Sequence, residues 1–184
     1  MFTEPWDIDM RPVIQLYGGG GFFDFEHPEL SVYTIEGLAH SIAQLCRFTG
    51  HTSRHYSVAQ HSVLVSHIVP PEFAYEGLMH DLHEAITGDA SSPMKLMLPD
   101  YRALEYFVQG HVLARFGLSL PLHPSVKEAD NRAVVTESRD CMPDDMPHLW
   151  TWAKHIRPLR RRILPLPAPM AKQLFLDRYQ ELTR

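Results

Sequence analysis

The sequence is short of cysteine, with only Cys46 and Cys141 among its 184 residues. Two cysteines do not make the disulfide framework of a small secreted protein, so we expect reduced thiols and a cytoplasmic protein. Long apolar runs are missing as well, since no stretch approaches the roughly 18 apolar residues that a membrane-spanning helix needs. The first residues, MFTEPWDIDMRP, lack the basic start and apolar run of a signal peptide. These absences predict no membrane partner.

An excess of positive charge is also absent. The chain has 17 Lys and Arg against 22 Asp and Glu, a formal net charge of −5. This acidity disfavours binding of nucleic acid through overall charge, so we expect no nucleic-acid partner. The basic run KHIRPLRRR, residues 154–162, is more often a solvated face, although a module binding nucleic acid through residues 157–162 stays open as an alternative. The glycines at 18–21 lack the Gly-Lys-Ser/Thr ending of a phosphate-binding loop.

The periodicity of apolar residues predicts a helical protein. We expect helices over residues 35–50, 57–69, 71–86, 101–116, 125–141 and 170–182, with a short one over 150–156 and a loop around the prolines at 93 and 99. Residues 12–33 read as a small β or extended element. Ser57 and Gln60 fit a capping box at the start of the second helix. The length suits one domain over residues 1–184, so the fold class expected is all-α with a small β element near the N-terminus.

Histidine is abundant, with 12 residues, and it is the commonest side-chain metal ligand. Polar residues also interrupt three predicted apolar helix faces: His61 in the second helix, the pair His80-Asp81 in the third, and Asp130 in the fifth. One buried histidine alone is usually a satisfied core residue. The combination on three faces favours a common site.

Buried carboxylates need a counter-charge, and no lysine or arginine lies on these three faces. A shared metal ion would serve Asp81, Asp130 and the two histidines at once. Two imidazoles with two carboxylates suit a divalent ion such as Mn, Co, Fe, Ni, Zn or Mg. The sequence therefore predicts a metal centre built from His61, His80, Asp81 and Asp130.

The motifs around these residues carry a family resemblance. YSVAQH ends at His61, LMHDLHEAITGD runs from residue 78 to 89, PMK follows at 93–95, and KEAD ends at Asp130. This pattern resembles the HD superfamily, most of all the bacterial HD 5'-deoxyribonucleotidases and the small phage HD dATP triphosphohydrolases. The resemblance covers roughly residues 34–140 and implies an all-α helical core. It also implies a homo-oligomer and the same four metal ligands.

The resemblance implies further roles, residue by residue. Glu84 would orient or activate water in catalysis, beside Asp81. Arg47 would contact the substrate phosphate, and Asp89 would lie near the sugar and phosphate. Phe48 stands where the nucleotidases have a tryptophan near the base, which leaves base preference open. The remaining basic candidate is Lys95, a phosphate ligand of most use to a substrate with several phosphates.

The expected activity is metal-dependent hydrolysis of a deoxynucleotide to deoxynucleoside and phosphate. A deoxynucleoside monophosphate and a triphosphate such as dATP both remain candidate substrates. A non-catalytic nucleotide sensor on an HD scaffold is the alternative from another class. Cyclic-dinucleotide phosphodiesterase activity is disfavoured because the extended HD-GYP signature is absent.

Overall fold

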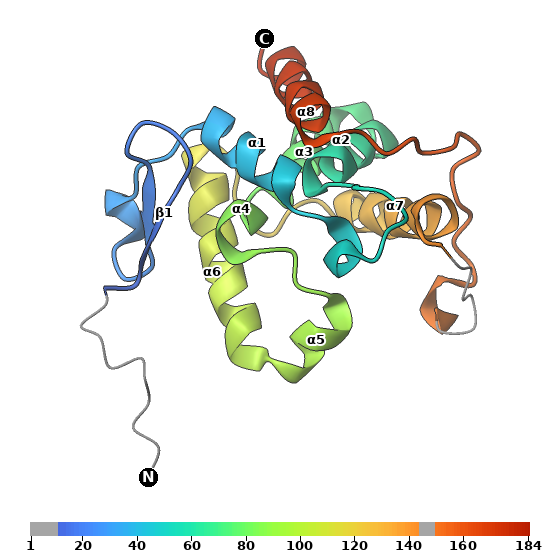
Figure 1. Cartoon of the computed structure of the whole chain (residues 1–184), viewed down its shortest axis with the longest axis horizontal. Coiled ribbons are helices and arrows are strands. Elements are labelled where there is room, and N and C mark those ends of the chain that lie inside the picture. Colours follow the sequence, from blue (N-terminus) through green and yellow to red (C-terminus); the bar gives the residue numbers. More distant parts are fainter. Residues whose placement is uncertain (1–10, 144–149) are drawn as a thin grey trace.

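The computed structural model describes residues 11–143 and 150–184, and that part of the chain is mostly helical (Figure 1). A two-stranded antiparallel hairpin lies near the N-terminus, where β1 (Val13–Gln15) pairs with β2 (Phe22–Asp24). Gly18, Gly19 and Gly20 all have positive φ and make the turn between the strands, which favours glycine there. The expectation of a helical protein with a small β element is confirmed.

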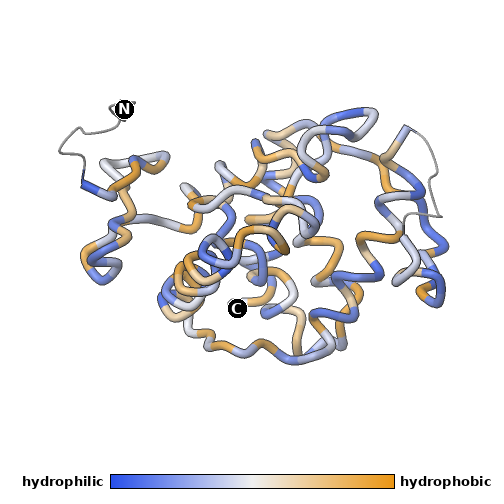
Figure 2. Tube along the Cα trace, turned by 90° about the horizontal axis from the view of Figure 1, so that it is seen from below, coloured by the Kyte–Doolittle hydropathy of each residue, from blue (hydrophilic) through white to orange (hydrophobic). Residues whose placement is uncertain are grey.

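The helices follow one another along the rest of the chain. They are α1 (Ile35–Gln44), α2 (Val58–Ile68), α3 (Ala74–Met79), α4 (Glu84–Thr87), α5 (Ser92–Met97), α6 (Pro99–Arg115), α7 (Pro124–Cys141) and α8 (Ala168–Leu182). Short 3-10 turns cover Pro28–Leu30, Arg47–Gly50, Pro71–Phe73 and Thr151–Ala153. Many helices alternate apolar and hydrophilic residues along the chain, as expected when one face packs inward (Figure 2). None of the helices in the described part of the chain is both long and apolar enough to cross a bilayer.

Helix α2 is the centre of the packing, since it contacts α1, α3, α7 and α8. On one side lies the larger core cluster, which includes Ile42, Leu78 and Phe175. On the other side lies a smaller cluster in which Val65 of α2 packs with Ala129 and other residues of α7. A polar side chain on an inward face of α2 is therefore shielded from water on every side. His61 occupies such a position, with no exposed surface.

The start of α2 confirms half of the predicted capping box. The Ser57 hydroxyl accepts a hydrogen bond from the Gln60 amide at 3.2 Å. The Gln60 side chain does not return to Ser57. It donates to the carbonyl of Leu164 at 2.8 Å and accepts from the amide of Leu166 at 2.9 Å. The segment before α8 carries backbone groups that need partners, and Gln60 satisfies two of them.

The continuous helix predicted over residues 71–86 is wrong. The chain forms a 3-10 turn, then α3, then a tight turn over residues 80–83, and then α4. In the tight turn, amides bond to carbonyls three residues back, from Leu82 to Met79 and from Glu84 to Asp81. Gln109 of α6 also donates to the carbonyl of His80 at 2.9 Å. This tightening changes the direction of Glu84 relative to a regular helix, and such 3-10 segments often occur at functional sites.

Three other boundaries differ from the prediction. The helix predicted over residues 35–50 ends at Gln44, because Leu45 and Cys46 are extended and the 3-10 turn Arg47–Gly50 follows them. Part of the predicted loop around the prolines at 93 and 99 is the short helix α5, which has Pro93 in its first turn. Proline is tolerated there because the first amides of a helix have no partner within it. The helix predicted over residues 150–156 is reduced to the 3-10 turn Thr151–Ala153.

Candidate metal centre

The four predicted ligands converge from three separate elements. Nε2 of His61 on α2 lies 3.3 Å from Nε2 of His80 and 3.3 Å from Oδ1 of Asp130 on α7. Oδ2 of Asp81 lies 3.1 Å from Nε2 of His80 and 3.4 Å from Nε2 of His61. Both histidines are buried, and the two carboxylates are only about one-sixth exposed, at 17% and 16%. His61, His80 and Asp130 form a group that could hold a metal ion.

The outer hydrogen bonds of the two histidines orient their inner nitrogens. Nδ1 of His80 lies 2.9 Å from the carbonyl of Gly77, which can only accept, so Nδ1 carries the hydrogen. Nδ1 of His61 lies 2.5 Å from a carboxylate oxygen of Glu137 and carries its hydrogen for the same reason. In the neutral imidazoles, both Nε2 atoms then present lone pairs to the carboxylates of Asp81 and Asp130. Lone pairs and carboxylate oxygens then meet at one point, and either a proton on Nε2 or a metal ion relieves their repulsion.

The donor set fits a divalent transition metal. Ligand atoms about 2.0–2.2 Å from one ion lie roughly 3.0–3.5 Å from each other in tetrahedral or octahedral geometry. The distances from His61 to His80, Asp81 and Asp130, and from His80 to Asp81, fall within this range. Two imidazoles and two carboxylates match the borderline ions expected from the sequence.

The electrostatic environment of His61 agrees with such a site. Burial and the nearby Arg47 lower its pKa, but Glu137, Asp130 and Asp81 outweigh them and raise the pKa well above its usual value. The same carboxylates that favour a proton on Nε2 favour a metal ion there. Proton and metal therefore compete for one position, as they do at metal sites generally.

Glu137 is a site residue that the sequence analysis did not assign. It is fully buried on α7, and Oε1 accepts hydrogen bonds from His61 and from the Tyr56 hydroxyl, the latter at 2.9 Å. Metal-bound histidines commonly donate their second N–H to a carboxylate in this way. In the sequence, Glu137 lies two helical turns after Asp130 on a face that is otherwise apolar, and this position could have identified it as a buried polar residue.

The expectation that only a metal could balance the buried carboxylates is wrong, because Arg47 supplies a positive charge beside them. It lies in the 3-10 turn after α1, and its guanidinium reaches Asp89 at 3.3 Å, Glu137 at 3.5 Å and Asp81 at 3.8 Å. Burial lowers the pKa of Arg47, but the negative charges of Glu137, Asp89 and Asp81 outweigh burial and raise the pKa well above its usual value, so the group stays charged. Its Nε has no hydrogen-bond partner among the described residues. Lys127 adds a second positive charge, 2.7 Å from Asp130.

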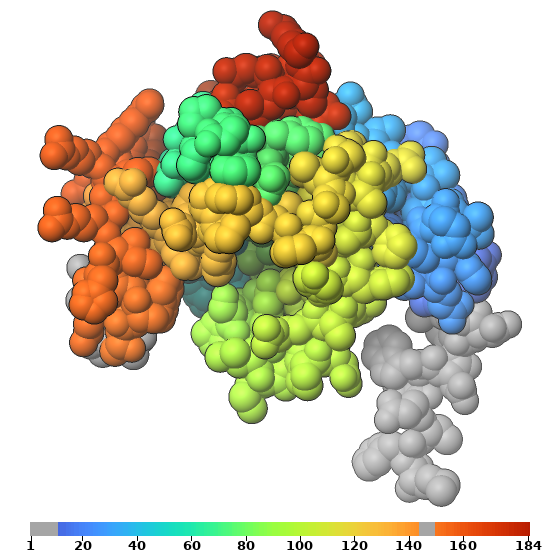
Figure 3. Space-filling model, turned by 180° about the vertical axis from the view of Figure 1, so that it is seen from behind, coloured from blue at the N-terminus to red at the C-terminus, as the bar shows by residue number. Residues whose placement is uncertain are grey.

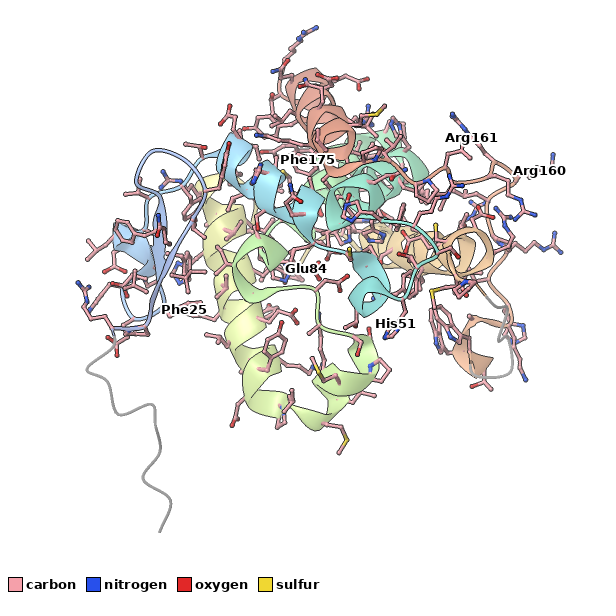
Figure 4. The ribbon with its side chains drawn as sticks, viewed as in Figure 1. Phe25, His51, Glu84, Arg160, Arg161 and Phe175 are labelled. Carbon is pink, nitrogen blue, oxygen red and sulfur yellow. The ribbon has the colours of Figure 1, made fainter. Side chains whose placement is uncertain are left out.

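Glu84 is buried in the same region, at the start of α4, as Figure 4 shows. Burial raises the pKa of its carboxyl well above the usual value, and the negative charges of Asp81 and Asp89 raise it further. Oε2 has no hydrogen-bond partner among the described residues, while Oε1 lies 4.0 Å from Nζ of Lys95. The carboxylate therefore keeps one free oxygen.

Lys95 has a partner that the sequence did not indicate. Its Nζ lies 2.5 Å from Oε1 of Glu105 on α6, so its charge is already paired. The two residues line a cleft of about 530 Å³ that also reaches Asp81, His83 and Arg102. Volumes of this size are typical of small-molecule sites. Of the four predicted metal ligands, Asp81 lines this cleft.

Phe48 follows Arg47 in a strained part of the chain. Both Phe48 and Thr49 have positive φ, at 54° and 53°, a conformation that side chains other than glycine rarely adopt. The ring of Phe48 stacks near that of Trp150, with centroids 6.1 Å apart. The strain places an aromatic ring beside the buried guanidinium of Arg47.

Comparison with known proteins places the chain in a family. No family model matches it. It is 36% identical over 171 residues to the uncharacterized protein YfdR of Escherichia coli K12, which covers 92% of this chain and 95% of that protein. It is 31% identical over 140 residues to the uncharacterized protein RCAP_rcc00048 of Rhodobacter capsulatus, 71% of each chain. The chain is thus a member of the same protein family as YfdR.

Proposed function

We propose that this protein is a metal-dependent phosphohydrolase of the HD type that acts on deoxynucleotides, with His61, His80, Asp81 and Asp130 as the metal ligands. The observation that carries the proposal is the convergence of four potential ligand atoms from three elements, at contact distances of 3.1–3.4 Å. The motif resemblance to HD nucleotidases and triphosphohydrolases supplies the substrate class.

A bound divalent ion would neutralise phosphate charge and lower the pKa of a water molecule. Glu84 is the general base in this proposal. Burial raises the pKa of its carboxyl, which makes the carboxylate a stronger proton acceptor than an ordinary glutamate. Its free oxygen Oε2 is available for that proton.

Arg47 and Lys95 are the proposed phosphate-binding residues. The unpaired Nε of Arg47 leaves a donor for a phosphate oxygen, while its terminal nitrogens hold Asp89 and Asp81 in place. Asp89 then acts mainly by fixing the guanidinium. Lys95 must release Glu105 before it can bind a phosphate, so it would serve a distal phosphate better than the reacting one.

The test is a panel of deoxynucleoside mono- and triphosphates, incubated with the protein and Mn, Co or Zn, in which release of deoxynucleoside is measured. We expect turnover of at least one substrate by the parent protein and loss of that turnover in Asp130→Asn. Glu128→Gln is the matched control, because it removes an exposed carboxylate from the same helix. Tight binding of nucleotide without turnover would instead make the protein a nucleotide sensor. Absence of both binding and turnover across the panel would contradict the proposal.

A further inference from the structure

The region between α7 and α8 contains a run of positive charge that the metal centre does not use. Residues 154–162, KHIRPLRRR, hold five of the 17 Lys and Arg and no Asp or Glu. We name this segment the basic strap. It crosses the outside of α7 as an extended, non-helical chain at one edge of the molecule (Figure 1).

The strap is fixed to α7 by hydrogen bonds to its backbone. Arg139 donates to the carbonyls of Leu159 and Arg161, at 2.6 and 3.3 Å, and the amide of Leu159 donates to the Thr136 hydroxyl at 3.0 Å. Arg132 donates to the carbonyl of Arg157 at 3.2 Å. Side chains of α7 therefore hold the strap by its backbone, and none of these hydrogen bonds uses the strap's own basic side chains.

Those side chains stay exposed and largely unpaired. Lys154, Arg157, Arg160 and Arg161 are exposed, and none of the four forms an ion pair within the described residues. Figure 4 shows Arg160 and Arg161 pointing away from the molecule, and Figure 3 shows the same edge protruding when seen from behind. Arg162 differs, since it pairs with Asp140 at 2.7 Å and so helps to fix the end of the strap.

Two features beside the strap point to the kind of partner. Trp152, two residues before the strap begins, is 52% exposed, and its ring stacks on that of Trp150 with centroids 5.7 Å apart. A hollow of about 410 Å³ lies between the strap and α7, and it is lined by His155, Ile156 and Arg157 of the strap and by Glu128, Asn131 and Arg132 of α7. An exposed indole on the same chain segment as several exposed, unpaired guanidinium groups is a combination with which proteins bind unpaired bases and their phosphates.

We propose that the basic strap and Trp152 form a binding surface for single-stranded nucleic acid, separate from the metal centre. Arginines 157, 160 and 161 contact successive phosphates, and the Trp152 ring stacks on a base. The acidity of the whole chain, which predicted no nucleic-acid partner, does not oppose this, because the positive charge is concentrated on one edge.

The test measures binding of a fluorescent 20-nucleotide single strand to the full-length protein by anisotropy, at several salt concentrations. The triple variant Arg157→Gln/Arg160→Gln/Arg161→Gln should bind more weakly and with a shallower salt dependence. The slope of log affinity against log salt should fall by about 0.7 per lost phosphate contact, or about 2 in all. Trp152→Ala should weaken binding about five- to a hundredfold.

The double variant Arg115→Gln/Arg184→Gln removes exposed positive charge elsewhere and should bind as the parent does. Unchanged melting temperature and metal content show that the strap variants remain folded. A duplex of the same length should bind more weakly than the single strand, because its bases are not free to stack. The proposal would be overturned if the duplex or polyglutamate bound as tightly as the single strand and Trp152→Ala had no effect. The surface would then bind acidic partners in general. Absence of binding by the parent protein would overturn it outright.

Discussion

Glu137→Gln is the change that probes the metal centre most directly without touching a ligand. Oε1 of Glu137 accepts from His61 and from Tyr56, and the glutamine oxygen can keep both hydrogen bonds. What disappears is the negative charge, and the new amide NH₂ faces the guanidinium of Arg47, which lies 3.5 Å from Oε2. Because the side chain is fully buried, solvent cannot screen the loss.

We expect the variant to bind Mn, Co or Zn about 10–100-fold more weakly, which corresponds to about 1.4–2.7 kcal/mol. Nδ1 of His61 then donates to a neutral oxygen, so Nε2 is less basic and less firmly oriented. The dissociation constant is measured by competition with a chromogenic chelator on folded protein.

Tyr56→Phe is the matched comparison, because it removes the other hydrogen bond to the same oxygen of Glu137 and leaves the contact with His61. It should lower stability by about 1 kcal/mol and leave metal affinity close to that of the parent protein. A Glu137→Gln protein that binds metal as tightly as the parent would refute the orienting role. Equal losses of metal affinity in both variants would show that Glu137 acts only through packing.

Three further outcomes test the proposed chemistry. Asp130→Asn should lose bound metal, measured by elemental analysis, whereas Glu128→Gln should keep it; equal content would remove Asp130 from the ligands. Glu84→Gln should keep metal and fold but lose turnover, and wild-type kcat would disprove its role as base. Lys95→Ala should lower kcat/KM for dATP about ten- to a hundredfold and kcat/KM for dAMP much less. Glu105→Gln should lower KM for dATP, because it frees the lysine to bind phosphate. If neither variant changes these constants, Lys95 serves only in a structural ion pair.

Much of the helical fold could be predicted from sequence, because apolar residues recur at helical spacing in α1, α2, α7 and α8. Periodicity also placed His61 and Asp130 on inward faces. It could not detect the tight turn after His80, because the same spacing fits a continuous helix and a helix interrupted by three-residue hydrogen bonds. That interruption is what determines the direction of Glu84.

The electrostatic partners were the hardest part to predict. The ion pairs of Arg47 with Asp89 and of Lys95 with Glu105 join different parts of the chain, so no local sequence pattern predicts them. Glu137 was visible as a polar residue on the inward face of α7, but its role depends on His61, which lies 76 residues away in sequence. The sequence thus indicates the candidate ligands and not the contacts that tune them.

The wide separation of the site residues along the chain has a consequence for folding. His61 and His80 are 19 residues apart, and the contact from His61 to Glu137 closes a loop of 76. Closing such loops costs chain entropy, which rises only slowly with loop length but must be met before the contacts form. A metal ion bound by residues of these segments would act as a cross-link between them in the folded protein. Removal of the ion should therefore speed unfolding more than it slows refolding.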